Sequence, residues 1–108
     1  MVPEYNFIVD DASTNYRLNV GGYSGTAGDS LGAYHNGMPF TTYDRDNDKR
    51  SYSNCAEQYK GAWWYNTCYH SNLNGLYLPG QYNVSSANWK HFADNHDGLK
   101  YIEMKMEL

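Results

Sequence analysis

Short stretches of apolar residues near both ends of the chain predict β-strands. Residues 5–9, YNFIV, form an apolar run that is followed by a polar turn. In residues 16–20, YRLNV, the first, third and fifth residues are apolar, which predicts a half-buried strand with Tyr16, Leu18 and Val20 facing a core. Residues 102–106, IEMKM, alternate in the same way and predict a closing strand.

Glycine marks the segment that follows the second predicted strand. Residues 21–28, GGYSGTAG, hold four glycines, which predicts a turn-rich connection whose backbone visits positive φ. A phosphate-binding loop would need a lysine followed by Ser or Thr, and this segment has neither. Residues 71–88 are also expected to be loop, because Asn74-Gly75 and Pro79-Gly80 interrupt them.

Helix is predicted in only two short places. Asp29 or Ser30 can cap a single helical turn, and residues 54–59 can form a short helix capped by Asn54 or Ser53. The consecutive apolar residues 63–65, WWY, predict instead a strand that is covered on both faces.

Composition narrows the class of protein. A chain of 108 residues makes one domain at most, and 12 tyrosines bring hydroxyl groups into much of its apolar content. The net charge is −4 with eight Lys plus Arg, so no basic surface for nucleic acid is expected. No apolar run approaches the roughly 20 residues that span a bilayer, and the first residues do not form a signal peptide. We therefore expect a soluble chain, with any secretion signal outside it.

The two cysteines admit three interpretations. Cys55 and Cys68 could be free thiols, half of a zinc site with His70, or a disulfide. The small, loop-rich context favours the disulfide, which would add about 3 kcal/mol of stability and implies an oxidising compartment. The N-glycosylation sequon Asn83-Val84-Ser85 is compatible with secretion.

Alternate carboxylates in residues 44–48, DRDND, predict a calcium site. Ca²⁺ accepts about 6 to 8 oxygen ligands from side chains and carbonyls together. The segment is not an EF-hand loop, because Lys49 stands where that loop needs Gly and Cys55 where it needs Glu. The alternative is a solvated acidic turn, with the cations Arg45, Lys49 and Arg50 balancing its charge.

Several separated motifs in one order resemble a known family. They are GTAGDSL at residues 25–31, DRDND at 44–48, NCA at 54–56, GAWWY at 61–65, SNLNG at 71–75 and EMK at 103–105. Together they resemble the C-terminal part of the fibrinogen-like domain found in ficolins, tachylectins, tenascins, angiopoietins and fibrinogen chains. A full domain of this family is roughly twice as long, so the chain resembles its second half.

The resemblance implies an α+β fold of the fibrinogen C-terminal type, with a small twisted antiparallel sheet, short helices and long loops that carry a calcium site. The chain is expected to be a single partial domain. Residues 1–43 would form the sheet and its connecting turns, residues 44–88 the calcium and ligand loops, and residues 89–108 a closing segment and strand. Apolar surface left by a missing neighbouring subdomain would favour a homo-oligomer.

The resemblance also implies a metal site. Cys55 and Cys68 would form the family's disulfide, while Asp46 and Asp48 would bind Ca²⁺ through their carboxylates. Two backbone carbonyls would complete this site, at Arg50 and Ser53, with Ser51 as the alternative to the first.

In lectin members of the family, an aromatic pocket beside the calcium loop receives an acetyl methyl next to a cis peptide bond. Here that bond would be Thr67–Cys68, and the implied ligand-binding residues are Tyr59, Thr67, Cys68, Tyr69, His70 and Tyr82. Lectin members read Cys-His where this chain reads Cys68-Tyr69-His70, so Tyr69 occupies the histidine position.

The resemblance implies a secreted, calcium-dependent, lectin-like recognition module that binds acetylated carbohydrates or N-acetyl groups, as in innate immunity. The alternatives are a module that binds an extracellular protein, such as a receptor or a peptide, and a structural matrix domain. No nucleophile motif or separated acid and base pair indicates an enzyme.

Overall fold

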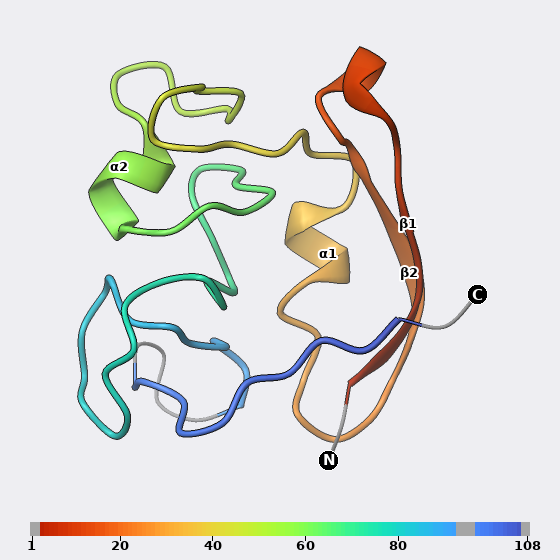
Figure 1. Cartoon of the computed structure of the whole chain (residues 1–108). Helices are drawn as coiled ribbons and strands as arrows, with labels where there is room; N and C mark the ends of the chain where they lie inside the picture. The colour runs from red at the N-terminus through yellow and green to blue at the C-terminus, as the bar shows by residue number, and fades with distance from the viewer. Residues whose placement is uncertain (1–2, 93–96, 107–108) are drawn as a thin grey trace.

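The computed structural model describes residues 3–92 and 97–106, and Figure 1 shows their arrangement. The strands are β1 (Glu4–Val9) and β2 (Leu18–Ser24), with the 3₁₀ turn η1 (Ala12–Thr14) between them. The helices are α1 (Gly32–His35) and α2 (Cys55–Tyr59). Loops make up most of the rest, and in Figure 1 they stand beside one long two-stranded ribbon.

β1 and β2 form an antiparallel pair in which Phe7 lies opposite Val20. Leu18 and Val20 are buried, so the predicted alternation holds for them. The expectation for Tyr16 is wrong, because this residue ends the turn between the strands with a φ of 59° and is exposed. Alternation alone did not show where the strand begins.

The glycine segment is partly strand. β2 continues through Gly21 and Gly22 to Ser24, so the predicted turn begins later than expected. Positive φ is confirmed at Gly22, Gly25 and Gly28. At Gly22 a Cβ would lie 2.6 Å from the side-chain nitrogen of Asn6, so glycine leaves room for that side chain.

Both predicted helices form, but only α2 has its predicted cap. The N-cap of α1 is Leu31, which makes no side-chain cap hydrogen bond, so the expectation of a cap at Asp29 or Ser30 is wrong. The carboxylate of Asp29 accepts hydrogen bonds from the backbone N–H groups of Leu31 and Gly32, at 3.1 and 2.7 Å. Asn54 accepts one from Ala56 N–H at 2.8 Å, which caps α2 as predicted.

Two predicted strands do not form in the described residues. Residues 63–65 make a single antiparallel bridge, between Thr41 and Trp63, although all three side chains are buried. Residues 101–106 have no regular structure, and Met106 is 71% exposed. Alternating residues form a strand only where a neighbouring edge accepts their backbone hydrogen bonds. No described backbone hydrogen bond joins residues 102–106 to such an edge.

Aromatic side chains hold the loops against the sheet. The rings of Trp63 and Trp64 pack with centroids 5.0 Å apart, and Phe7 of β1 meets Trp64 edge to face at 5.7 Å. The indole N–H of Trp64 donates to the carbonyl of Tyr16 at 3.0 Å, and that of Trp89 donates to Gly28 at 2.7 Å. The sheet is small, so the loops are held in place mainly by buried aromatic area and by these hydrogen bonds.

Candidate functional site: an aromatic cavity beside an acidic loop

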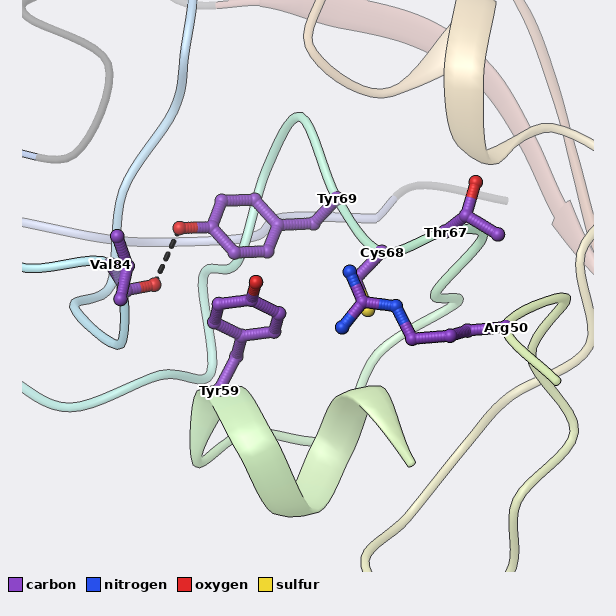
Figure 2. A pocket seen from close by; sticks show the side chains of 6 residues that line it. All are labelled: Arg50, Tyr59, Thr67, Cys68, Tyr69 and Val84. Carbon is purple, nitrogen blue, oxygen red and sulfur yellow. Dashed lines mark hydrogen bonds between the residues drawn. The ribbon is translucent and has the colours of Figure 1, made fainter. Parts of the chain in front are cut away.

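A cavity of about 200 Å³ opens where three loops meet the end of α2. Figure 2 shows the six residues that line it, which are Arg50, Tyr59, Thr67, Cys68, Tyr69 and Val84. The cavity therefore depends on contacts between segments that are separated in sequence.

Two tyrosines form one wall of the cavity. The rings of Tyr59 and Tyr69 meet edge to face at 87°, with centroids 5.1 Å apart. The hydroxyl of Tyr69 donates to the backbone carbonyl of Val84, as Figure 2 shows, and accepts from the side-chain amide of Asn88 at 3.3 Å. Burial raises the pKa of Tyr69, so its hydroxyl stays protonated and remains a donor at neutral pH.

Arg50 is the charged member of the cavity lining. Its guanidinium carbon lies 5.8 Å from the centroid of the Tyr59 ring and 5.2 Å from that of Tyr52, within reach of cation–π attraction. The guanidinium also donates to the side-chain oxygen of Gln58. In Figure 2 it points toward Tyr59 and past Cys68.

A disulfide joins α2 to the cavity wall. Cys55 and Cys68 are bonded, with their Cα atoms 5.6 Å apart, and the Thr67–Cys68 peptide bond is cis. The carbonyl of Cys68 accepts from the backbone N–H of Asn66 at 2.8 Å. The thiol and zinc interpretations of the two cysteines are therefore replaced by the disulfide.

His35 of α1 holds the same loop from the other side. Its Nε2 accepts from the backbone N–H groups of His70 and Ser71, at 3.0 and 3.3 Å. The proton is consequently on Nδ1, which donates to the carbonyl of Trp64 at 2.9 Å. Complete burial lowers the pKa of His35 to about 4, so the ring is neutral at physiological pH.

The structure brings together four of the six predicted ligand-binding residues. Tyr59, Thr67, Cys68 and Tyr69 line the cavity. His70 lies outside this lining, where its ring stacks on Tyr34 with centroids 4.0 Å apart. Burial lowers the pKa of His70, and the nearby Lys90 and His91 charges lower it further.

Tyr82 also lies outside the cavity lining. It is 66% exposed and forms an isolated antiparallel bridge with Asp97.

Sequence reasoning missed the Arg50 side chain and Val84. The family resemblance implies a role only for the backbone carbonyl of Arg50, and Val84 has no local signal because its role depends on the distant Tyr69. A cation three residues before a predicted helix cap was the available clue for Arg50.

The acidic loop is ordered by its own carboxylates. Asp46 accepts from the backbone N–H of Asp48 at 3.2 Å. Asp48 accepts from the N–H groups of Arg50 and Cys55, each at 2.9 Å, so it ties the loop to the start of α2. Partial burial raises the pKa of Asp48, and the neighbouring Asp46 carboxylate adds to that rise.

The donor set in this loop fits a hard cation. Among the described residues, no cluster of three or more His, Cys, Asp or Glu side chains is present, so a site made entirely of side chains is not indicated. The carbonyls of Arg50 and Ser53 accept none of the described backbone hydrogen bonds. Two carboxylates with two carbonyls match the oxygen chemistry of Ca²⁺.

Comparison with known proteins places this small, disulfide-bonded α+β domain in a class. Residues 2–107 match the family described as fibrinogen beta and gamma chains, C-terminal globular domain, and the chain belongs to that family. Over 100 residues it is 49% identical to tenascin-R of Rattus norvegicus, covering 93% of this chain and 7% of that protein. Over 103 residues it is 43% identical to techylectin-5A of Tachypleus tridentatus, covering 94% and 35%.

Solved structures confirm the fold. The fibrinogen-like globe domain of human ANGPTL2 superimposes with a TM-score of 0.84 at 43% identity, covering 91% of this chain and 47% of that one. A lamprey fibrin D-dimer complexed with the peptide Gly-His-Arg-Pro-amide gives 0.79 at 30% identity, covering 91% and 38%. The chain thus spans under half the length of each of these two structures. In residues 3–92 and 97–106, no helix has the length and apolar character needed to cross a membrane.

Proposed function

We propose that this chain is a secreted recognition domain, not an enzyme, and that it binds an acetyl group in the cavity of Arg50, Tyr59 and Tyr69. The observation that carries the proposal is the size and lining of this cavity. Its volume of about 200 Å³ is below the range of roughly 300 to 1,000 Å³ that holds a drug-sized ligand, so one small group fits. The disulfide supports an oxidising, secretory location.

The lining explains why the group would be acetylated. An acetyl methyl would pack on the Tyr59 ring, while its carbonyl oxygen would accept a hydrogen bond from the guanidinium of Arg50. A free amine carries a positive charge that Arg50 repels. The same site would therefore discriminate between an N-acetyl group and the corresponding amine.

A calcium ion bound in the acidic loop would stabilise the lining of this cavity. We propose that Asp46 and Asp48 hold the ion with the carbonyls of Arg50 and Ser53. The loop that would bind the ion also contains Arg50, which lines the cavity. In the same loop, the carboxylate of Asp48 accepts a hydrogen bond from the backbone N–H of Cys55. Occupancy would fix the loop and thereby the position of the guanidinium.

Equilibrium titration with N-acetylglucosamine and with glucosamine, each in calcium, tests the acetyl site. The acetylated sugar should bind in the millimolar range and the amine at least about tenfold more weakly. Arg50→Gln should weaken the acetylated sugar about tenfold or more, the loss expected for a charge-assisted hydrogen bond of about 1.5 kcal/mol or above. Lys49→Gln is the matched control, because it removes the same charge next to Arg50 but outside the cavity lining. Equal binding of the two sugars, or no binding at millimolar concentration, would overturn the acetyl site.

A second candidate is binding of an extracellular protein. The similarity to tenascins, to the ANGPTL2 globe and to a fibrin structure complexed with a peptide favours it, as does tyrosine at the Tyr69 position. Capture of a defined matrix or receptor protein that N-acetylglucosamine fails to displace would support it. Displacement by the sugar would assign that protein to the acetyl site instead.

A further inference from the structure

We propose that Asn83 carries an N-linked glycan that stands at the mouth of the cavity, where it admits small acetylated ligands and excludes bulky ones. The glycan assignment is independent of ligand binding, whereas its gating role rests on the proposed function.

Both the sequence motif around Asn83 and its exposure to solvent favour glycosylation of this residue. Asn83-Val84-Ser85 is the single Asn-x-Ser/Thr sequon in the 108 residues, and its middle residue is not proline. Asn83 and Val84 are both exposed. A modifying enzyme and its product therefore meet no packing obstacle at Asn83.

Local hydrogen bonds orient the amide of Asn83. Its side-chain oxygen accepts from the backbone N–H of Ser85 at 2.8 Å, and its backbone carbonyl accepts from Ser86 N–H at 3.0 Å. Because the oxygen of the carboxamide faces the backbone, the nitrogen Nδ2 is directed away from it. Asn83 is exposed, so the atom that would accept a glycan can be reached from solvent.

The modification is a glycosyl transfer from a lipid-linked oligosaccharide diphosphate, the donor used in the secretory pathway. Nδ2 of Asn83 forms a bond to the anomeric carbon of the first N-acetylglucosamine and loses one proton. The bond from that carbon to the diphosphate oxygen breaks, and the lipid diphosphate leaves with its electron pair. No oxidation or reduction is involved.

The next residue places this glycan at the cavity. Val84 lines the cavity, and its carbonyl accepts the hydroxyl hydrogen of Tyr69, so the turn that carries Asn83 is tied directly to the aromatic wall. A branched oligosaccharide is larger than the cavity of about 200 Å³ and cannot fill it. It would cover the approach to the cavity, past which a monosaccharide can diffuse and a protein surface cannot.

The fraction of Asn83 that carries a glycan is measured on the full chain secreted from mammalian cells. Peptide mapping by mass spectrometry should find a glycan on Asn83, lost in Asn83→Gln and in Ser85→Ala and retained in Ser85→Thr. Ser85→Ala keeps the Asn83 side chain and its hydrogen bond to the turn, so it serves if Asn83→Gln folds poorly. An unmodified Asn83 in the secreted wild-type protein would overturn the assignment.

Gating is measured with two probes that carry the same group, free N-acetylglucosamine and chemically acetylated serum albumin. The glycosylated protein and Ser85→Ala should bind the free sugar within twofold of each other. Acetylated albumin should bind the glycosylated protein at least tenfold more weakly than Ser85→Ala. Equal binding of albumin to both forms would overturn the gating. If neither form binds the free sugar, the proposed acetyl site and the gating role are both wrong. Peptide mapping by mass spectrometry still shows whether Asn83 carries a glycan.

Discussion

Nε2 of His35 accepts a hydrogen bond from the backbone N–H of His70 at 3.0 Å, so a helix of four residues holds the loop behind the cavity wall. The contact joins residues that are 35 positions apart in the sequence. Because the ring also donates to Trp64, one buried side chain connects α1, the tryptophan segment and the ligand loop.

Replacing His35 should therefore destabilise the whole domain. In His35→Leu the N–H groups of His70 and Ser71 lose their acceptor within the protein interior, and we expect a loss of about 2 to 4 kcal/mol in the free energy of unfolding. Urea unfolding followed by tryptophan fluorescence measures it. Tyr43→Ala, at a side chain 73% exposed, should change stability by no more than about 0.5 kcal/mol. A similar small change for His35→Leu would contradict the role of the contact.

Stability should fall with acidity because His35 is buried in its neutral form. Its pKa is lowered from 6.5 to about 4 in the folded protein, so between these values the unfolded chain binds more protons. The contribution of neutral His35 to the free energy of unfolding is complete above about pH 6.5 and is lost as the pH falls to about 4. The loss is on the order of 3 kcal/mol. Unfolding free energies at pH 7 and 4.5 should differ less in His35→Leu than in the wild type. Equal differences would exclude His35 as the source.

Tyr69→Phe tests the tie between the aromatic wall and the turn at Val84. The variant keeps the ring but leaves the carbonyl of Val84 without its donor, which should cost about 1 kcal/mol of stability. Backbone amides of residues 83–86 should exchange hydrogen faster, as measured by mass spectrometry. Tyr77→Phe is the control, since its hydroxyl donates to the carbonyl of Lys100 away from the cavity lining. Unchanged exchange in Tyr69→Phe would show that this hydrogen bond does not order the turn.

Calcium should stabilise the folded protein through Asp46 and Asp48. At a free concentration of about 100 times its dissociation constant, a bound ion adds about 2.7 kcal/mol, so chelation should lower the melting temperature. Asp46→Asn should abolish this dependence. Asp44→Asn should preserve it, because the Asp44 carboxylate accepts from Thr42 and is outside the proposed ligand set. A calcium response that survives Asp46→Asn would place the ion elsewhere.

Removing the disulfide should loosen the cavity together with the fold. Cys55 and Cys68 are 13 residues apart, and for a loop of this size the chain-entropy model gives about 3 kcal/mol. The double variant Cys55→Ser, Cys68→Ser should unfold at lower urea and lose affinity for N-acetylglucosamine. Retained affinity would mean that packing alone holds Cys68 in the cavity wall.

Prediction from sequence succeeded where the signal is local. The cap at Asn54 was recognisable because its side chain acts on N–H groups two and three residues away, those of Ala56 and Glu57. The alternation at Leu18 and Val20 likewise reports a surface that one strand presents by itself. The family motifs also predicted the disulfide and the cis peptide bond. The composition of the chain only favours the disulfide, and it gives no information about the cis bond.

Contacts between distant segments decided the rest. Residues 102–106 have the pattern of a strand but no described edge to pair with, and residues 63–65 are buried among loops instead of in a sheet. Arg50 reaches Tyr59, and Tyr69 reaches Val84, only after the chain has folded. A side chain's chemistry is set by its own atoms and near neighbours, whereas a cavity needs walls from several loops, so the local sequence supplies the donors and the tertiary fold brings them together.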